Sequence, residues 1–164
     1  MEGPLTGKVA TLGQEQLHFA ELAVSMDNAA NKTKISIVQG DTQLTPSIAT
    51  TVTQQLTSNS AIVGVVGPAG SQEVKAIGTL MARAGLAFIS GSATNPTLTT
   101  GIYPTFFRVV SKDSVQGPQD AHYIISHLHP RALMIVDDQE IYSTGLVAAM
   151  TPVFTAAGIR VDHE

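Results

Sequence analysis

The chain alternates between short apolar stretches and longer segments in which apolar residues recur every three or four positions. The second spacing is that of an amphipathic helix, and a short apolar run bounded by polar residues is typical of a buried strand. Helices are predicted at residues 14–30, from 46 past 56, 71–84, 113–127 and 143–157. Strands are predicted at residues 34–38, 61–66, 86–89, 106–110, 133–136 and 159–161.

Capping residues mark where several of these helices begin and end. Thr45 followed by Pro46 is a strong helix start, and Ser71 is predicted to cap the next helix. Gly85 is predicted to close that helix in the left-handed conformation. Pro152 lies inside the last predicted helix, where it should produce a kink.

The order of these elements predicts the fold class. Strands that alternate with helices imply an α/β protein with a doubly wound parallel sheet, Rossmann-like in its winding. Residues 61–66 are apolar without alternation, which is typical of a strand covered on both faces. In such folds ligands bind in the loops at the carboxyl ends of the strands.

The composition narrows the classes of function. A length of 164 residues suffices for one domain or two small ones. Charged residues make up only 13% and the net charge is −4, so the chain offers no basic surface and we expect no nucleic-acid binding. The absence of cysteine excludes disulfides, thiolate zinc sites and thiol nucleophiles.

The chain shows no segment with the pattern of a membrane anchor or leader. No apolar run approaches the roughly 20 residues of a membrane span. The first residues lack the basic start and apolar stretch of a signal peptide, so we expect no signal peptide in this chain.

Signatures of catalysis and cofactor binding are missing. Gly64-Val65-Val66-Gly67 is not followed by the Gly-Lys-Ser/Thr of a phosphate-binding loop, and the Rossmann and nucleophile-elbow motifs are absent. His127 and His129 lie where a helix should end before Pro130, and no acidic partner is near them in sequence. The sequence therefore predicts no enzyme, no cofactor and no metal site.

Two loops are better candidates for a site, and both follow predicted strands. Residues 67–71 lead into a helix whose free N–H groups and dipole attract a carboxylate or phosphate. Residues 90–96 offer hydroxyls and closely approaching backbone. The alternative is that Ser71 is only a helix cap and Thr94-Asn95-Pro96 only a turn, and composition alone favours that interpretation.

Several motifs spread over the whole chain carry a resemblance to a known family. They are Gly3-Pro4-Leu5-Thr6-Gly7, Ala20-Glu21-Leu22-Ala23, Val66-Gly67-Pro68-Ala69-Gly70-Ser71, Gly85-Leu86-Ala87-Phe88-Ile89-Ser90, Ser92-Ala93-Thr94-Asn95-Pro96, Phe107-Arg108, Gln116-Gly117-Pro118 and Tyr142-Ser143-Thr144-Gly145-Leu146. In these motifs the chain resembles the type I periplasmic binding proteins. Those are the solute receptors of branched-chain amino acid ABC transporters.

The resemblance implies binding without catalysis and suggests a role for each site residue. Ser71 would bind the ligand carboxylate through its hydroxyl and backbone N–H, and Thr94 would hold the same carboxylate and the ammonium group. Ser92 would offer its carbonyl to the ammonium group. The remaining expected ligand-binding residues are Ala69 and Gly70 at the floor, Ala93, Tyr142 from a second lobe, and Leu12, where the family often has an aromatic residue.

The resemblance also implies that the chain has two parts and that one strand of the first part is missing. Residues 1–110 would form an incomplete first ligand-binding lobe, and residues 111–164 the beginning of a second lobe (helix, strand, helix, strand). The crossing at residues 108–113 would be the hinge. Relatives of this kind are about twice as long. The first strand of the lobe, which should lie between residues 34–38 and 61–66, is missing, so two apolar strand edges would lack a partner.

These implications leave several functions open. The leading hypothesis is a solute-binding protein, or its N-terminal half, that takes a branched-chain-like amino acid or a similar small carboxylate and works with the membrane permease of an ABC transporter. Its location would be periplasmic or extracellular. The alternatives are a ligand-sensing regulatory domain of the same fold and an interaction fragment that binds nothing. The missing strand leaves three possibilities. The chain pairs with another copy by strand exchange and forms a homo-oligomer, it borrows an element from its own second half, or it is a piece of a longer protein.

Overall fold

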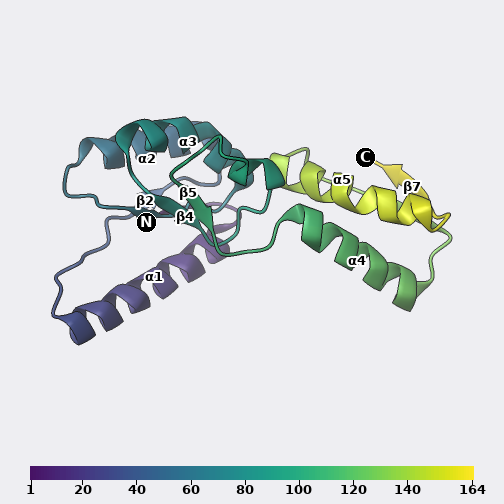
Figure 1. Ribbon diagram of the computed structural model, residues 1–164, viewed down its shortest axis with the longest axis horizontal. Coiled ribbons are helices and arrows are strands. Elements are labelled where there is room, and N and C mark those ends of the chain that lie inside the picture. The colour runs from purple at the N-terminus through teal and green to yellow at the C-terminus, as the bar shows by residue number, and fades with distance from the viewer.

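Two hydrophobic cores, one toward each end of an elongated molecule, organise the fold (Figure 1). The computed structural model describes residues 1–164. Its helices are α1 (Ala10–Asn31), α2 (Pro46–Ser58), α3 (Ser71–Ala84), α4 (Asp113–Leu128) and α5 (Ile141–Ala156), with a 3-10 turn η1 (Pro96–Thr99). None of them combines the length and the apolar character that a membrane span requires.

All strand pairs are parallel, as the alternating pattern predicts. β1 (Glu2–Gly3) pairs with β2 (Gly40–Asp41). β3 (Val65–Val66), β4 (Phe88–Ser90) and β5 (Phe106–Arg108) form a second sheet in that order. β6 (Ala132–Ile135) pairs with β7 (Arg160–His163) at the far end of the molecule. The architecture is thus the expected α/β one, built on parallel strands.

The larger core lies between the central sheet and one helical layer. Val65, Phe88 and Phe106 are aligned across β3, β4 and β5 and point toward α2 and α3. The rings of Phe88 and Phe106 lie 5.0 Å apart. From α3, Ile77 and Met81 complete this core and are fully buried. The burial of these side chains is the main stabilising contribution in this part of the molecule.

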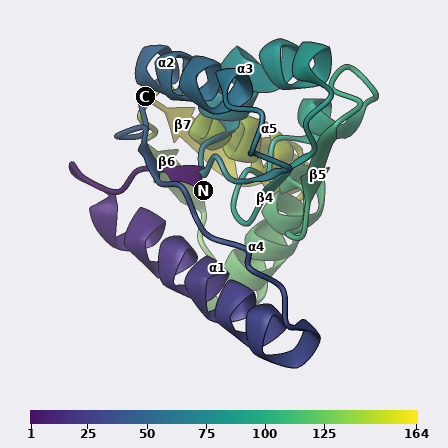
Figure 2. The ribbon, with the colours of Figure 1, turned by 90° about the vertical axis from the view of Figure 1, so that its left-hand side faces the viewer.

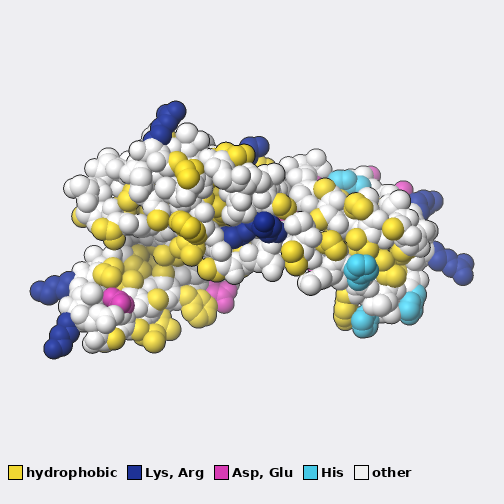
Figure 3. Space-filling view, in the orientation of Figure 1, with side chains coloured by type: hydrophobic (Ala, Val, Ile, Leu, Met, Phe, Trp, Pro, Cys, Tyr) yellow, Lys and Arg dark blue, Asp and Glu magenta, His cyan; other side chains and the backbone are white.

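The opposite face of the same sheet is largely bare. Val66, Ile89 and Phe107 form the next rung across the strands, and all three remain exposed. Helix α1 lies on this side, so that the sheet runs between α1 below and α2 with α3 above (Figure 2). Hydrophobic side chains gather in the hollow between α1 and the upper layers (Figure 3). The sheet is therefore well covered on only one face.

The smaller core joins the two C-terminal helices to the last strand pair. Ala121 of α4, Phe154 of α5 and Ile159 are buried together. Gly117 lets the helices approach, because a Cβ at this position would stand 2.8 Å from the Cβ of Ala149. α4 and α5 lie side by side at the right of Figure 1.

Two predicted strands are wrong in length and burial. Residues 34–38 form no regular strand, and pairing starts only at Gly40. In residues 61–66 only Val65 and Val66 are in a strand, and Val63 is 87% exposed. The physical reason is that residues 34–38 and 61–64 have no adjacent strand to pair with, whereas Val65 and Val66 pair with β4. Residues 1–3 are the only segment on this side that reaches β2, where the Gly40 N–H donates to the Met1 carbonyl at 2.8 Å.

The predicted helix boundaries are mostly confirmed. Thr45 precedes Pro46 at the start of α2, and Gly85 ends α3 with φ of 66°. The predicted capping role of Ser71 is wrong, because the cap position is Gly70 and Ser71 is the first helical residue. α5 continues through Pro152 to Ala156.

Candidate functional site

The two loops that the sequence singles out are joined in the structure by side-chain hydrogen bonds. The Ser92 hydroxyl donates to the Ala69 carbonyl at 2.8 Å, and the Ser90 hydroxyl donates to the Pro68 carbonyl at 2.6 Å. The Asn95 N–H donates to the Ser71 hydroxyl oxygen at 3.2 Å. Both loops follow neighbouring parallel strands, β3 and β4, so their ends meet at one edge of the sheet.

The first loop reaches this position by passing very close to β1. Gly67 has φ of 110°, and a Cβ there would stand 1.7 Å from the Glu2 carbonyl oxygen. Only glycine permits both the positive φ and the close approach. The loop is therefore fixed between β1 on one side and the second loop on the other.

The N-terminus of α3 presents unpaired donors at this junction. The Gly70 N–H donates to the carboxylate of Glu73 at 2.7 Å. The N–H groups of Ser71, Gln72 and Glu73 donate to no group of the protein. Because the helix dipole adds a partial positive charge at the same point, these donors suit an anionic group such as a carboxylate.

The hydroxyls of Ser71 and Thr94 beside these donors are buried, and each can still donate a hydrogen bond to a ligand. Ser71 is only 1% exposed, and its hydroxyl accepts from Asn95 while its own hydrogen remains free to donate. The hydroxyl of Thr94 is buried and faces the Asp113 carboxylate, but it makes no hydrogen bond of normal geometry. The Ser92 carbonyl accepts no hydrogen bond within the protein. The arrangement thus offers neutral donors and an acceptor to one small polar ligand.

Two buried carboxylates lie behind the α3 N-terminus. Burial raises the pKa of Glu73, an effect opposed by the Thr42 hydroxyl and the Gly70 N–H. Burial also raises the pKa of Glu2 to about 7, although the Thr53 hydroxyl stabilises its ionised form. The charge of Glu73 is a further cause that raises the pKa of Glu2, because a like charge nearby disfavours ionisation.

A third buried carboxylate lies next to Thr94. Asp113 is fully buried, and burial raises its pKa, while the Thr94 hydroxyl and the Arg108 guanidinium oppose the shift. Arg108 is held in place by the Asn95 carbonyl at 2.9 Å and the Thr99 hydroxyl at 2.7 Å. The backbone of Asp113 also donates to the Thr94 carbonyl at 3.1 Å.

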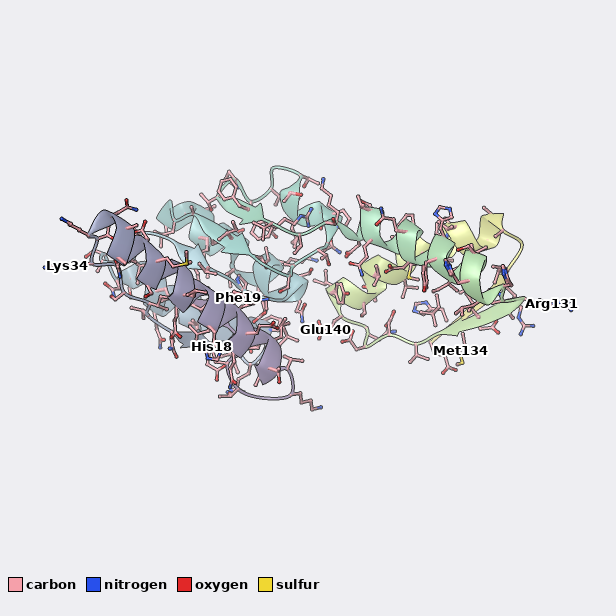
Figure 4. All side chains as sticks on the ribbon, turned by 90° about the horizontal axis from the view of Figure 1, so that it is seen from below. His18, Phe19, Lys34, Arg131, Met134 and Glu140 are labelled. Atoms are coloured by element: carbon pink, nitrogen blue, oxygen red, sulfur yellow. The ribbon has the colours of Figure 1, made fainter.

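The structure brings together most of the predicted site residues and places two at the periphery. Ala69, Gly70, Ser71, Ala93 and Thr94 are buried where the loops meet, and Ser92 is half-buried. Tyr142 is exposed in the first turn of α5, next to Ile141, whose carbonyl accepts from the Asn95 side chain at 3.2 Å. Glu140, which precedes α5, lies near the middle of the molecule, between the part that contains α1 and the part that contains α4 and α5 (Figure 4).

Leu12 lies on α1 and not on either of the two loops. It is exposed on α1, one helical turn before Gln16. The Gln16 side-chain amide donates to the Ser92 hydroxyl at 2.9 Å and so links α1 to the second loop. Sequence reasoning missed Gln16, Glu73, Asn95 and Asp113 as parts of this site. For Asn95 alone there was a signal, its place inside the predicted loop.

The two loops bring together hydrogen-bond donors and acceptors and lack a paired nucleophile and base. No three His, Asp or Glu side chains come close enough together to hold a metal ion. Such neutral, directional groups are suited to binding a zwitterion or a small carboxylate.

Comparison with known proteins gives the chain a context. A family model described as periplasmic binding protein matches residues 1–164. The Leu/Ile/Val-binding protein of Escherichia coli is 32% identical over 151 residues, which are 90% of this chain and 41% of that protein. The chain therefore spans less than half the length of the curated relatives it matches.

Solved structures agree in fold over almost the entire chain. The branched-chain amino acid transporter substrate-binding protein of Streptococcus pneumoniae, in complex with isoleucine, superposes with a TM-score of 0.89 at 29% identity and covers 99% of this chain and 47% of that one. A leucine-binding protein of Thermotoga maritima gives a TM-score of 0.91 at 21% identity, with 99% and 47% covered, and supports the fold alone.

Proposed function

This chain belongs to the periplasmic binding protein family, and from that premise we propose that it binds a branched-chain-like amino acid or a similar small carboxylate without chemical change. The family is one of binding proteins, which agrees with the prediction that the chain is not an enzyme. The relatives named above bind leucine, isoleucine or valine, and this supports the ligand class.

The observation that carries the proposal is the set of unpaired donors at the start of α3. The ligand carboxylate would accept from the N–H of Ser71 and from its hydroxyl, whose hydrogen is not used within the protein. Thr94 would donate to the same carboxylate. Since these donors are buried and already in place, binding costs little ordering of the loops.

The remaining contacts distinguish an amino acid from a simple acid. The free carbonyl of Ser92 would accept from the ammonium group of the ligand. Ala69, Gly70 and Ala93 would form the floor, and Leu12 and Tyr142 would approach from the two sides. A hydrocarbon side chain would then meet mostly apolar surface.

Calorimetric titration tests this function directly. We expect heat of binding with leucine, isoleucine or valine, and we expect Ser71→Ala and Thr94→Val each to weaken binding at least tenfold, because each removes a buried hydrogen bond to a charged group. Ser126→Ala, at an exposed hydroxyl on α4, is the matched control and should leave the affinity unchanged. Equal affinity of all variants, or no heat with any amino acid or aromatic acid, would overturn the proposal.

We also propose that the chain divides at residue 110 into two lobes. Residues 1–110 would be an incomplete first lobe and residues 111–164 the start of a second. The separation of the two hydrophobic cores supports this division. Location in the periplasm or outside the cell, and delivery of the ligand to the permease of an ABC transporter, are proposed by analogy with the family.

The unpaired strand edges support a further part of the proposal, exchange of strands between copies. Residues 34–38 and 61–64 have almost no backbone pairing, and Ile35, Val38 and Val63 are exposed. Unpaired apolar edges favour association with another strand. Light scattering after size exclusion should therefore give a mass of two or more chains, and a well-folded monomer at high concentration would exclude exchange.

A further inference from the structure

The loop that carries Thr94 also makes the contact with the C-terminal helices. The side-chain amide N–H of Asn95 donates to the Ile141 carbonyl in the first turn of α5 at 3.2 Å. The amide oxygen of the same side chain accepts from the N–H and the hydroxyl of Thr97, at 3.1 and 2.7 Å. These bonds fix both the orientation and the position of Asn95, so it is a rigid link between the ligand loop and α5.

One turn further along α5, the backbone of Gly145 lies close to the side chain of Asn95 in the same loop. A Cβ at this position would stand 2.8 Å from the Asn95 amide nitrogen and 3.0 Å from an Asp113 carboxylate oxygen. A distance below 3.0 Å is too short for a methyl group, so a larger residue here must displace the Asn95 side chain, and with it its bond to Ile141, or shift α5 itself. The absence of a side chain at Gly145 therefore sets how closely α5 approaches.

Asp113 fills the space beneath this contact. Its carboxylate is fully buried and has no hydrogen-bond partner for either oxygen. It faces the Thr94 hydroxyl, the Arg108 guanidinium and the backbone of Gly145. A buried carboxylate without partners is costly, and it is placed where the first lobe, α4 and α5 meet. Its charge attracts Arg108, which in turn holds the carbonyls of Ala93 and Asn95.

We propose that Asn95, Asp113 and Gly145 are positioning residues for ligand binding, a role that rests on the function proposed above. They hold the first turn of α5, and with it Tyr142, at a fixed height over the loop that carries Ser92 and Thr94. Through Asp113 they also hold the backbone of Thr94 itself. A change at Gly145, which touches no ligand, then alters both the placement of the C-terminal helices and the affinity.

The experiment combines a distance measurement with a titration. The chain has no cysteine, so Ser58→Cys in α2 and Ser126→Cys in α4, both exposed, allow spin labels to be placed without background. In this doubly labelled chain, Gly145→Ala is expected to shift the interspin distance and to raise the dissociation constant for leucine at least tenfold. Gly64→Ala is the matched control, because its Cβ would meet only the Ala87 carbonyl, at 3.5 Å.

A second variant keeps the test independent of steric effects. Asp113→Asn retains the shape and removes the charge, and we expect weaker leucine binding with an intact far-ultraviolet circular dichroism spectrum. An unchanged distance distribution in Gly145→Ala would overturn the proposal. So would a shifted distance with unchanged affinity, because the junction would then be structural only.

Failure of the proposed function is recognisable separately. If the unsubstituted chain binds no amino acid, the ligand function fails and the claim on affinity falls with it. The distance measurement still decides whether Gly145 sets the placement of α5.

Discussion

Glu2 is a buried carboxylate whose environment in the folded chain raises its pKa. It is fully buried in β1, its only hydrogen-bond donor is the Thr53 hydroxyl, and Glu73 lies near enough to disfavour its charge. Its pKa is raised to about 7 in the folded chain. A buried carboxyl in such a setting ties the stability of this part of the molecule to pH.

The sign of this dependence follows from the direction of the shift. Because the folded state holds the proton more tightly, the contribution of Glu2 to stability is fully present below about pH 4.5 and is lost as the pH rises toward 7. The loss should be about 3 kcal/mol at most. Urea unfolding of the unsubstituted chain and of Glu2→Gln between pH 5 and 8 measures it. The substituted chain should show a flatter dependence, and parallel curves would contradict the assignment.

Helix α1 shows how an element can form with little support from its neighbours. In its 22 residues only Gly13 and Leu17 are buried, while Phe19, Leu22 and Met26 are exposed. Its first half is attached through the close approach of Gly13 to the Pro4 carbonyl and the bond from Gln16 to Ser92, whereas near its far end Asn28 bonds only to the segment that follows, at Ile35 and Thr33. We therefore expect the far end of α1 to open more easily than α3.

A pair of substitutions in α1 separates packing from exposure. Leu17→Ala should lower the free energy of unfolding by about 2 kcal/mol, because it removes a buried side chain. Phe19→Ala, at a side chain that is 66% exposed, should change it by less than about 0.5 kcal/mol. Chemical denaturation measures both. A large effect of Phe19→Ala would show that this side chain is covered in solution, for example by a second copy.

At the scale of the whole molecule, the accessible surface is large for the length. The chain exposes 9333 Å². A compact monomer of this size exposes roughly 7,800 Å². The difference matches the elongated shape of Figure 1 and the bare face of the sheet, where Val66, Ile89 and Phe107 remain exposed.

The two cores differ in size, and stability should differ with them. Eleven buried residues form the core around α3, and three form the core between α4, α5 and Ile159. Amide hydrogen exchange should therefore be slower in β4 and α3 than in β6 and β7. Equal protection of the amides in all four elements would mean that the chain unfolds as one cooperative unit.

Much of the fold follows from local patterns that the sequence displays. Thr45-Pro46 and Gly85 mark helix ends whether or not the rest of the molecule is present, because their conformational preferences are local. The strand predicted at residues 34–38 is absent and the one predicted at residues 61–66 is reduced to Val65 and Val66, because a strand requires a partner and a partner is a property of the assembled sheet.

The two loops of the candidate site could be predicted from the sequence, but the residues on the neighbouring helices that contact these loops could not. Ser71 and Thr94 lie in motifs that the family resemblance picks out. Glu73, Asp113 and Gln16 come from separate helices, and nothing in their local sequence signals that they converge on the two loops.

The sequence by itself therefore determined the class of the fold, the helix boundaries, the family resemblance and the residues at the two loops, since all of these depend on short-range preferences or on motifs read in order. Only the tertiary structure decided which strands find a partner, which sheet face remains bare, and how Gly145 brings α5 against Asn95 and Asp113. The physical reason is that pairing, burial and close approach are made between segments distant in the chain, where no local preference acts.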